Sequence, residues 1–203
     1  MGKVFFTADL HFGHANIIKT CNRPFNSVED MDEALIKNWN RRVGQNDTVY
    51  ILGDFMFRAK NPPEYYLRQL RGRKHLLIGN HDQWIKKCDL SAFFISVHDE
   101  WHTSDGQHAI SLNHYPMMSW PHENRAYMVF GHLHNAMTGD KIEYICKQER
   151  MLNAGVEINH YEPVTFDKLL ENNRLFKENI LIDLVEKKVL DDNFEAFKTL
   201  AKS

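Results

Sequence analysis

Four short apolar runs in this sequence each stop at a small group of Asp, Asn or His residues. The clearest is residues 49–52, Val-Tyr-Ile-Leu, which Gly53 and Asp54 follow directly. A run of this length and composition is typical of a strand that is buried on both faces of a parallel sheet. In open α/β sheets, ligands bind beyond the carboxyl ends of the strands. The sequence therefore predicts a parallel sheet that carries Asp54 at its functional edge.

The other three runs have the same organisation. Residues 3–8, 74–78 and 127–130 are mainly apolar, and the polar groups that follow them are Asp9-Leu10-His11, Gly79-Asn80-His81-Asp82 and Gly131-His132-Leu133-His134. Because the carboxyl ends of parallel strands share one edge, we expect these polar residues to meet. Carboxylate and amide oxygens together with imidazole nitrogens suit a pair of transition-metal ions. Asp54 is the natural bridge between two such ions.

The segments between the runs predict helices. Ser27 is a typical amino-terminal cap with acidic residues in the turn after it, and apolar residues follow at helical spacing at Met31, Leu35, Ile36, Trp39 and Val43. The proline pair at 62–63 predicts the start of a second helix that runs toward residue 71. Helices that alternate with buried strands are typical of the α/β class.

Beyond residue 88 the pattern changes to strands. Residues 93–103 and 107–114 are rich in β-forming residues and flank Asp105-Gly106, which is a hairpin turn signal. They predict antiparallel strands of a second sheet, with His114 at a strand end. The predicted fold is therefore α/β, a two-sheet β-sandwich flanked by helices.

Five of these polar elements occur in a fixed order along the chain. They are Asp9-x-His11, Gly53-Asp54, Gly79-Asn80-His81-Asp82, the single His114 and Gly131-His132-x-His134. The set resembles the signature of the calcineurin-like metallophosphoesterases, and five ordered elements are far more specific than one. The resemblance covers roughly residues 3–170 and implies a four-layer αββα fold. We expect one domain over residues 1–203, in which residues 173–203 form a helical extension.

The resemblance also implies which residues hold two metal ions. The first ion would be held by Asp9, His11, Asp54 and His134. The second would be held by Asp54, Asn80, His114 and His132. We predict manganese as the bound metal, and iron, nickel or zinc suit the same ligands. Asp9 and His11 are two residues apart, as are His132 and His134, so each pair would point to one face of an extended backbone.

The chemistry implied by this resemblance is metal-dependent hydrolysis of a phosphomonoester or phosphodiester. Two ions roughly 3.5–4 Å apart lower the pKa of a bridging water from about 16 toward 7 and clamp the phosphoryl oxygens. The predicted nucleophile is therefore a metal-bridging hydroxide. His81 would stabilise the phosphoryl group or protonate the leaving oxygen, and Asp82 would orient His81.

Three further residues are candidates for contacts with the substrate. His14 lies where a loop turns into a short helix, and the amino end of a helix favours phosphate. A histidine that caps the helix is an equal alternative. Arg23 would reach a phosphate bidentately, and Arg58 is a second candidate for a phosphate contact; the alternative for each is a solvated surface arginine.

Three other classes of function compete with a small-molecule phosphoesterase. A nuclease or RNA-end-processing enzyme would use the same chemistry, but the sequence has no evident nucleic-acid domain, long basic groove or aromatic platform. A non-catalytic interaction module would be expected to have lost ligands, and here all are present. A redox metal site favours two histidines and one carboxylate. We therefore expect a small phosphorylated substrate or a nucleotide as the partner.

Composition is consistent with a globular enzyme. The 203 residues are 43% hydrophobic and 26% charged, and the net charge of -2 argues against a protein that wraps duplex nucleic acid. Three scattered cysteines favour reduced thiols. The first apolar run is cut by Asp9 before it would serve as a signal peptide or membrane span. We expect a cytoplasmic protein without membrane attachment.

Overall fold

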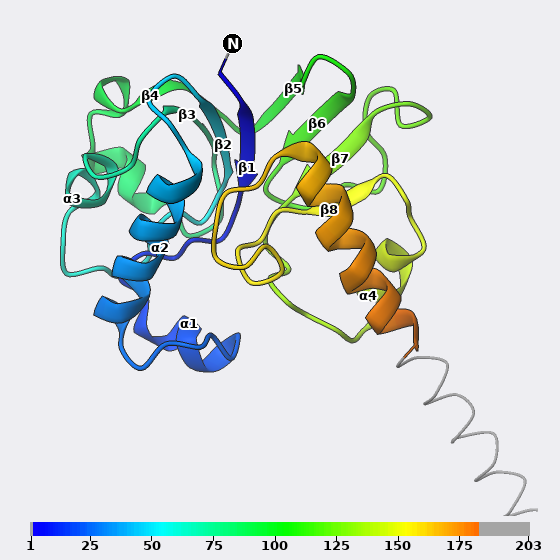
Figure 1. Ribbon diagram of the computed structural model, residues 1–203, viewed down its shortest axis with the longest axis horizontal. Helices are drawn as coiled ribbons and strands as arrows, with labels where there is room; N and C mark the ends of the chain where they lie inside the picture. Colours follow the sequence, from blue (N-terminus) through cyan, green and yellow to red (C-terminus); the bar gives the residue numbers. More distant parts are fainter. Residues whose placement is uncertain (1, 183–203) are drawn as a thin grey trace, which may run out of the picture.

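The structure is a computed structural model that describes residues 2–182 (Figure 1). Its first sheet has four parallel strands in sequence order, namely β1 (Val4–Thr7), β2 (Thr48–Leu52), β3 (Arg73–Leu77) and β4 (Phe94–His98). Thr7 pairs with Ile51, and Leu52 pairs with Leu77. The carboxyl ends of β1, β2 and β3 are therefore level, as the four-run pattern predicts.

The second sheet also has four strands, β5 (Glu100–Ser104), β6 (Ala109–Asn113), β7 (Tyr127–Phe130) and β8 (Met151–Asn153). The hairpin between β5 and β6 is antiparallel, as predicted, and the other pairs are parallel. The prediction of one antiparallel strand over residues 93–103 is wrong. The chain divides at Asp99, and β4 joins the first sheet in parallel with β3. Residues 78–93, which include the short 3-10 helices Gln83–Lys87 and Leu90–Ala92, provide the long crossover that parallel pairing needs.

Helices cover the outer face of the first sheet. Helix α2 (Val28–Arg42) begins where predicted, with the Ser27 hydroxyl accepting a hydrogen bond from the backbone N–H of Asp30. Its buried stripe packs into one cluster with residues of β1, β2 and β3. Helix α1 (Ala15–Thr20) precedes it, and α3 (Pro63–Leu67) begins at the predicted proline but ends before residue 71.

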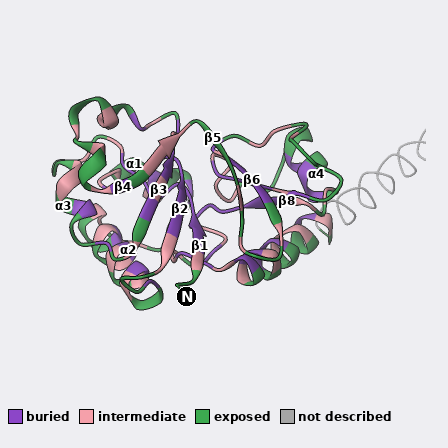
Figure 2. Cartoon of the chain, turned by 90° about the horizontal axis from the view of Figure 1, so that it is seen from above, coloured by how far each residue is buried: buried purple, intermediate pink, exposed green. Residues whose placement is uncertain are grey.

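The two sheets pack face to face. Phe6 and Leu52 of the first sheet share a buried cluster with Leu112 and Val129 of the second. On the far side of the second sheet, α4 (Asp140–Cys146) packs against β7 and β8 and against the helix over residues 166–182. The layers are therefore helix, sheet, sheet and helix, and Figure 2 shows buried strands between more exposed helices. The predicted αββα sandwich is confirmed.

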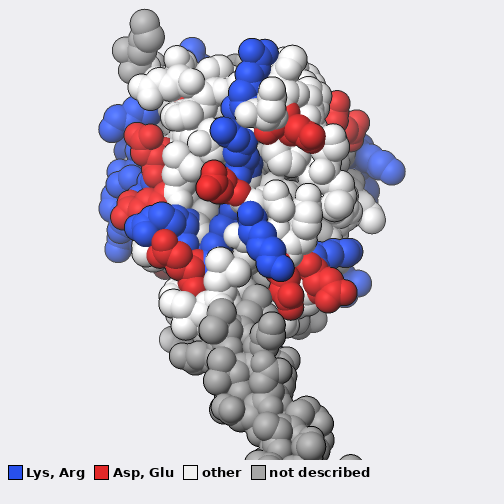
Figure 3. Space-filling model, turned by 90° about the vertical axis from the view of Figure 1, so that its right-hand side faces the viewer, with Lys and Arg blue, Asp and Glu red and all other residues white. Residues whose placement is uncertain are grey.

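The predicted helical extension is only partly described. Helical backbone continues to residue 182, and residues 183–203 lie outside the described residues. In the part of the chain that the structure describes, no helix is both long and apolar enough to span a bilayer. On the face shown in Figure 3, Lys and Arg side chains are interspersed with Asp and Glu.

The end of β1 joins the two sheets. The backbone N–H of Phe6 donates to Val164 (2.8 Å), and that of Ala8 donates to Ala154 just after β8 (2.9 Å). This seam brings the loops after β1, β2, β3, β6 and β7 to one edge of the sandwich. The predicted metal ligands all lie in these loops.

Candidate metal centre

The loops after β1 and β2 run side by side. The N–H of Asp9 donates to Gly53 (3.0 Å), and that of His11 donates to Asp54 (2.9 Å). Gly53 has a φ of +82°, and a Cβ at this position would collide with the His114 ring and with Gly79. A glycine is therefore required where the loops from β2, β3 and β6 approach most closely.

Five of the predicted ligands have a left-handed backbone. The φ angle is positive at Asp9 (57°), His11 (52°), Asp54 (53°), His132 (69°) and His134 (50°). Such angles are rare in residues other than glycine and concentrate at functional sites. The prediction of extended backbone through the two-residue spacings is therefore wrong. Because each residue departs from strand geometry, side chains from one loop can turn toward different ligand groups.

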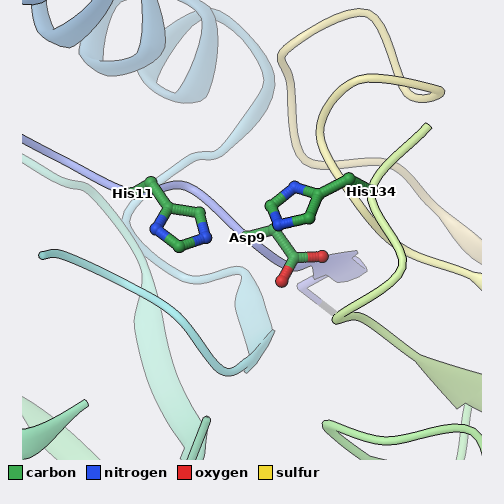
Figure 4. A group of neighbouring side chains, drawn as sticks. All are labelled: Asp9, His11 and His134. Carbon is green, nitrogen blue, oxygen red and sulfur yellow. The ribbon is translucent and has the colours of Figure 1, made fainter. Parts of the chain in front are cut away.

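One ligand group consists of Asp9, His11 and His134 (Figure 4). One potential ligand atom from each lies within 4.8 Å of the others. The His11 and His134 rings face each other with centroids 5.1 Å apart. Within the described residues, Asp9 Oδ2 and His11 Nε2 are buried without a hydrogen-bond partner. Buried polar atoms are rarely left unpaired, so this group fits a cation, with carboxylate and imidazole ligands.

A second group surrounds Asn80. Its Oδ1 lies 2.9 Å from His114 Nε2 and 3.0 Å from His132 Nδ1. The other ring nitrogen of His114 lies 2.8 Å from the carbonyl of Leu52, to which it would donate. That hydrogen bond fixes the tautomer and leaves Nε2 available to a metal. The two histidines of the last motif therefore belong to different groups.

Asp54 lies between the groups. Its Oδ2 is 3.4 Å from His11 Nε2 and 3.6 Å from His114 Nε2. Its Oδ1 accepts a hydrogen bond from the backbone N–H of His81 (2.8 Å). One carboxylate thus contacts a member of each group, which is the arrangement expected of a bridging ligand.

The electrostatics of two carboxylates and three histidines of the cluster favour a positively charged occupant. Burial raises the pKa of Asp9 to about 8 and also raises the pKa of Asp54, because each carboxylate has lost its water. Burial lowers the pKa of His11, His114 and His132, which keeps these imidazoles neutral. A divalent ion would stabilise both ionised carboxylates and would bind neutral imidazole.

Comparison with known proteins gives the family. The family model described as Calcineurin-like phosphoesterase matches residues 2–191. The chain belongs to this family. It is 34% identical over 183 residues to the protein MJ1445 of Methanocaldococcus jannaschii, covering 87% of this chain and 96% of that one.

Two further proteins are similar to smaller or larger parts of this chain. The gene 66 protein of Mycobacterium phage L5 is 39% identical over 85 residues, which are 40% of this chain and 41% of the phage protein. The crystal structure of the protein of unknown function AQ665 from Aquifex aeolicus superimposes with a TM-score of 0.65 and 27% identity, covering 83% of this chain and 98% of that one.

The predicted role of Asp82 requires correction. Its carboxylate accepts hydrogen bonds from the backbone N–H groups of Asp54 (2.8 Å), Phe55 (2.9 Å) and Gly79 (2.8 Å) and from Trp84 Nε1 (2.8 Å). These four bonds occupy both oxygens, so Asp82 fixes the loops after β2 and β3 to each other. Asp82 therefore positions the backbone of Asp54 instead of orienting the His81 ring.

Arg23 is neither a substrate contact nor a solvated surface arginine. It is 3% exposed, and its guanidinium donates to the carbonyls of Asp9 (2.7 Å) and Leu10 (2.9 Å). It also donates to Glu157 Oε1 through NH2 (2.7 Å) and Nε (3.1 Å). The guanidinium of Arg23 therefore donates its hydrogen bonds to groups inside the protein.

His14 and Arg58 lie beside the centre. His14 precedes α1, makes no side-chain cap, and places Nδ1 3.3 Å from His11 Nδ1. Burial lowers its pKa to about 4, with further lowering from the charges of nearby His81 and Arg23. Arg58 is exposed and lies over the Phe57 ring at 5.0 Å. Both line one cavity, so their role as substrate contacts stays a prediction.

Sequence reasoning missed Glu157. Its Oε1 lies 2.9 Å from His134 Nδ1, and its side chain is 1% exposed. Residues 151–157, Met-Leu-Asn-Ala-Gly-Val-Glu, have a weaker form of the pattern seen four times elsewhere, in which a short apolar run ends at polar residues with ligand chemistry. That pattern would have placed Glu157 among the candidates.

Replacing His114 by alanine is expected to weaken metal binding at the group around Asn80 and also to lower stability. The ring is 1% exposed and hydrogen bonds to Leu52, so its loss removes a ligand and leaves a buried cavity. Elemental analysis and a thermal melt of the metal-free variant separate the two effects. His122→Ala is the matched control, because His122 is exposed. If His114→Ala retained both metals, this ligand assignment would be wrong.

Proposed function

We propose that this protein hydrolyses a phosphomonoester or phosphodiester at a centre of two divalent transition-metal ions. The observation that carries the proposal is the position of Asp54 Oδ2, within 3.6 Å of ligand nitrogens from both groups. Asp9, His11, Asp54 and His134 would hold one ion, and Asp54, Asn80, His114 and His132 would hold the other. When bound, such a pair lowers the pKa of a shared water and neutralises phosphoryl oxygens.

His81 is positioned to act on the substrate. Its side chain is 33% exposed, and Nε2 lies 4.0 Å from Asp54 Oδ2, so the ring is next to the proposed bridge. Its ring meets that of Phe57 edge-on at 4.3 Å, a contact that restrains its orientation. In our proposal His81 holds no metal. It donates a proton to the leaving oxygen or a hydrogen bond to the phosphoryl group.

The surroundings of the centre support a small phosphorylated substrate or a nucleotide. A cavity of about 350 Å³ opens beside His11, and His14, Arg58, Lys60 and Tyr66 are among the residues that line it. On the other side of the centre, Tyr115 is 47% exposed, and its ring centroid lies 4.5 Å from that of His132. Arginine and lysine attract phosphate, and an exposed aromatic ring stacks on a nucleobase.

A hydrolysis panel tests this proposal. Metal-free protein is resupplied with manganese, iron, nickel or zinc, one at a time, and is given phosphomonoesters, phosphodiesters, nucleotides and short oligonucleotides. We expect metal-dependent release of phosphate or of a cleaved ester in at least one arm, and the same protein with chelator is the control. Cleavage restricted to oligonucleotides would favour the nuclease alternative. No hydrolysis with any metal would overturn the proposal.

A further inference from the structure

We propose that the buried ion pair between Arg23 and Glu157 positions the ligands of the first metal ion. This inference rests on the proposed function, because it assigns a role toward that metal centre. The pair joins residues 134 positions apart in sequence. One member contacts the loop that carries Asp9, and the other contacts His134.

Glu157 controls the orientation of the His134 ring. Its Oε1 lies 2.9 Å from Nδ1, so an ionised carboxylate makes Nδ1 the protonated nitrogen and directs the lone pair of Nε2 away from Glu157. The backbone of His134 is held as well, because Asn153 Nδ2 donates to its carbonyl (2.7 Å). A carboxylate that accepts from the remote nitrogen of a ligand histidine fixes the ring and makes it a better ligand.

Arg23 holds the opposite side of the same group. Its NH2 donates to the carbonyl of Asp9 and its NH1 to the carbonyl of Leu10. Asp9 and His11, on either side of Leu10, both have left-handed backbone, a conformation that needs support from the surroundings. The guanidinium thus binds the loop from β1 and the carboxylate that orients His134 at the same time.

The environment of the pair favours a positioning role over a stabilising one. The two side chains are 0% and 1% exposed, so both charges have lost their water. Replacing a buried ion pair by apolar residues is often neutral or stabilising, whereas removing one partner leaves a buried charge and is strongly destabilising. A pair kept at this cost between two ligand-bearing loops is best explained by the geometry that it imposes.

The test separates metal binding from folding. The double variant Arg23→Met with Glu157→Leu removes both charges and keeps similar volumes, so we expect it to fold, as a thermal melt would show. We expect the affinity for Mn²⁺ at the first site, measured by equilibrium dialysis, to fall about 10- to 100-fold. Glu157→Gln keeps an acceptor for His134 but leaves the Arg23 charge unpaired, so it should melt at a lower temperature and, while folded, lose less metal affinity than the double variant. Glu162→Gln is the matched control, because Glu162 forms a more exposed pair with Arg41.

A spectroscopic measurement adds a result that a merely structural role would not give. With Zn²⁺ bound, nitrogen NMR of the imidazoles should show His134 protonated at Nδ1 in the wild type and altered in the double variant. A folded double variant that binds Mn²⁺ as tightly as wild type, with an unchanged His134 signal, would overturn the inference and leave the proposed function intact. A wild-type protein that binds no metal would overturn both.

Discussion

Replacing Asp54 by alanine is expected to remove both metal ions of the proposed centre and with them the proposed hydrolytic activity. Its Oδ2 contacts a ligand nitrogen of each group, so no other residue compensates for its loss. Loss of a residue that only supports a ligand typically costs 10- to 100-fold in metal affinity or activity, so loss of a shared ligand should cost more than about 100-fold. Elemental analysis after dialysis and a rate measurement on an active ester check this.

Two controls make the Asp54 result specific. Asp54→Asn keeps an acceptor for the backbone N–H of His81 and removes the charge, so it should keep the loop in place while metal binding falls. Asp105→Asn changes a carboxylate in the β5–β6 turn and should bind metal as the wild type does. Full double occupancy in Asp54→Ala would remove Asp54 from the bridging role.

Replacing His81 by alanine or asparagine is expected to lower kcat by on the order of 10²- to 10⁴-fold, which is the usual contribution of a positioned acid or base. Both metals should remain, because His81 belongs to neither ligand group. The melting temperature should stay close to that of the wild type, because the side chain is one-third exposed. Steady-state kinetics, elemental analysis and a thermal melt measure these three properties.

The leaving group distinguishes between the two roles open to His81. If the imidazole protonates the leaving oxygen, the loss should be smaller for a nitrophenyl ester, since nitrophenolate departs without help. An equal loss for good and poor leaving groups would indicate stabilisation of the phosphoryl oxygens. Unchanged turnover on every substrate would exclude both roles. His75→Ala is a suitable control, because His75 lies within β3 and bonds to Ser96.

The strands that carry the site could be read from the sequence because burial has a local signature. The runs before Asp9, Asp54, Asn80 and His132 are mainly apolar, and each forms a strand that ends at the shared edge. Residues 93–103 were harder to divide into strands, because β4 and β5 both consist of β-forming residues and only Asp99 separates them. Which sheet each half joins depends on the crossover that precedes it.

The local backbone at the ligands was not predictable from residue type. Nothing in a D-x-H or G-H-x-H spacing marks a left-handed φ, and we expected extended backbone there. The loops adopt the left-handed conformation because hydrogen bonds from neighbouring loops hold them, such as those from Asp9 to Gly53 and from His132 to Asp9 Oδ1 (3.0 Å). These contacts are long-range, so a single segment carries no sign of them.

The sequence by itself determined the fold class and the family and predicted the candidate metal ligands in two groups, because short apolar runs and ordered polar motifs encode them. Only the tertiary structure decided that five of the candidate ligands have left-handed backbone, that Asp82 holds backbone and that Arg23 is buried against Glu157. The physical reason is that burial and hydrogen-bond partners depend on segments far apart in the chain. An arginine beside a turn looks the same in sequence whether water or a buried carboxylate surrounds it.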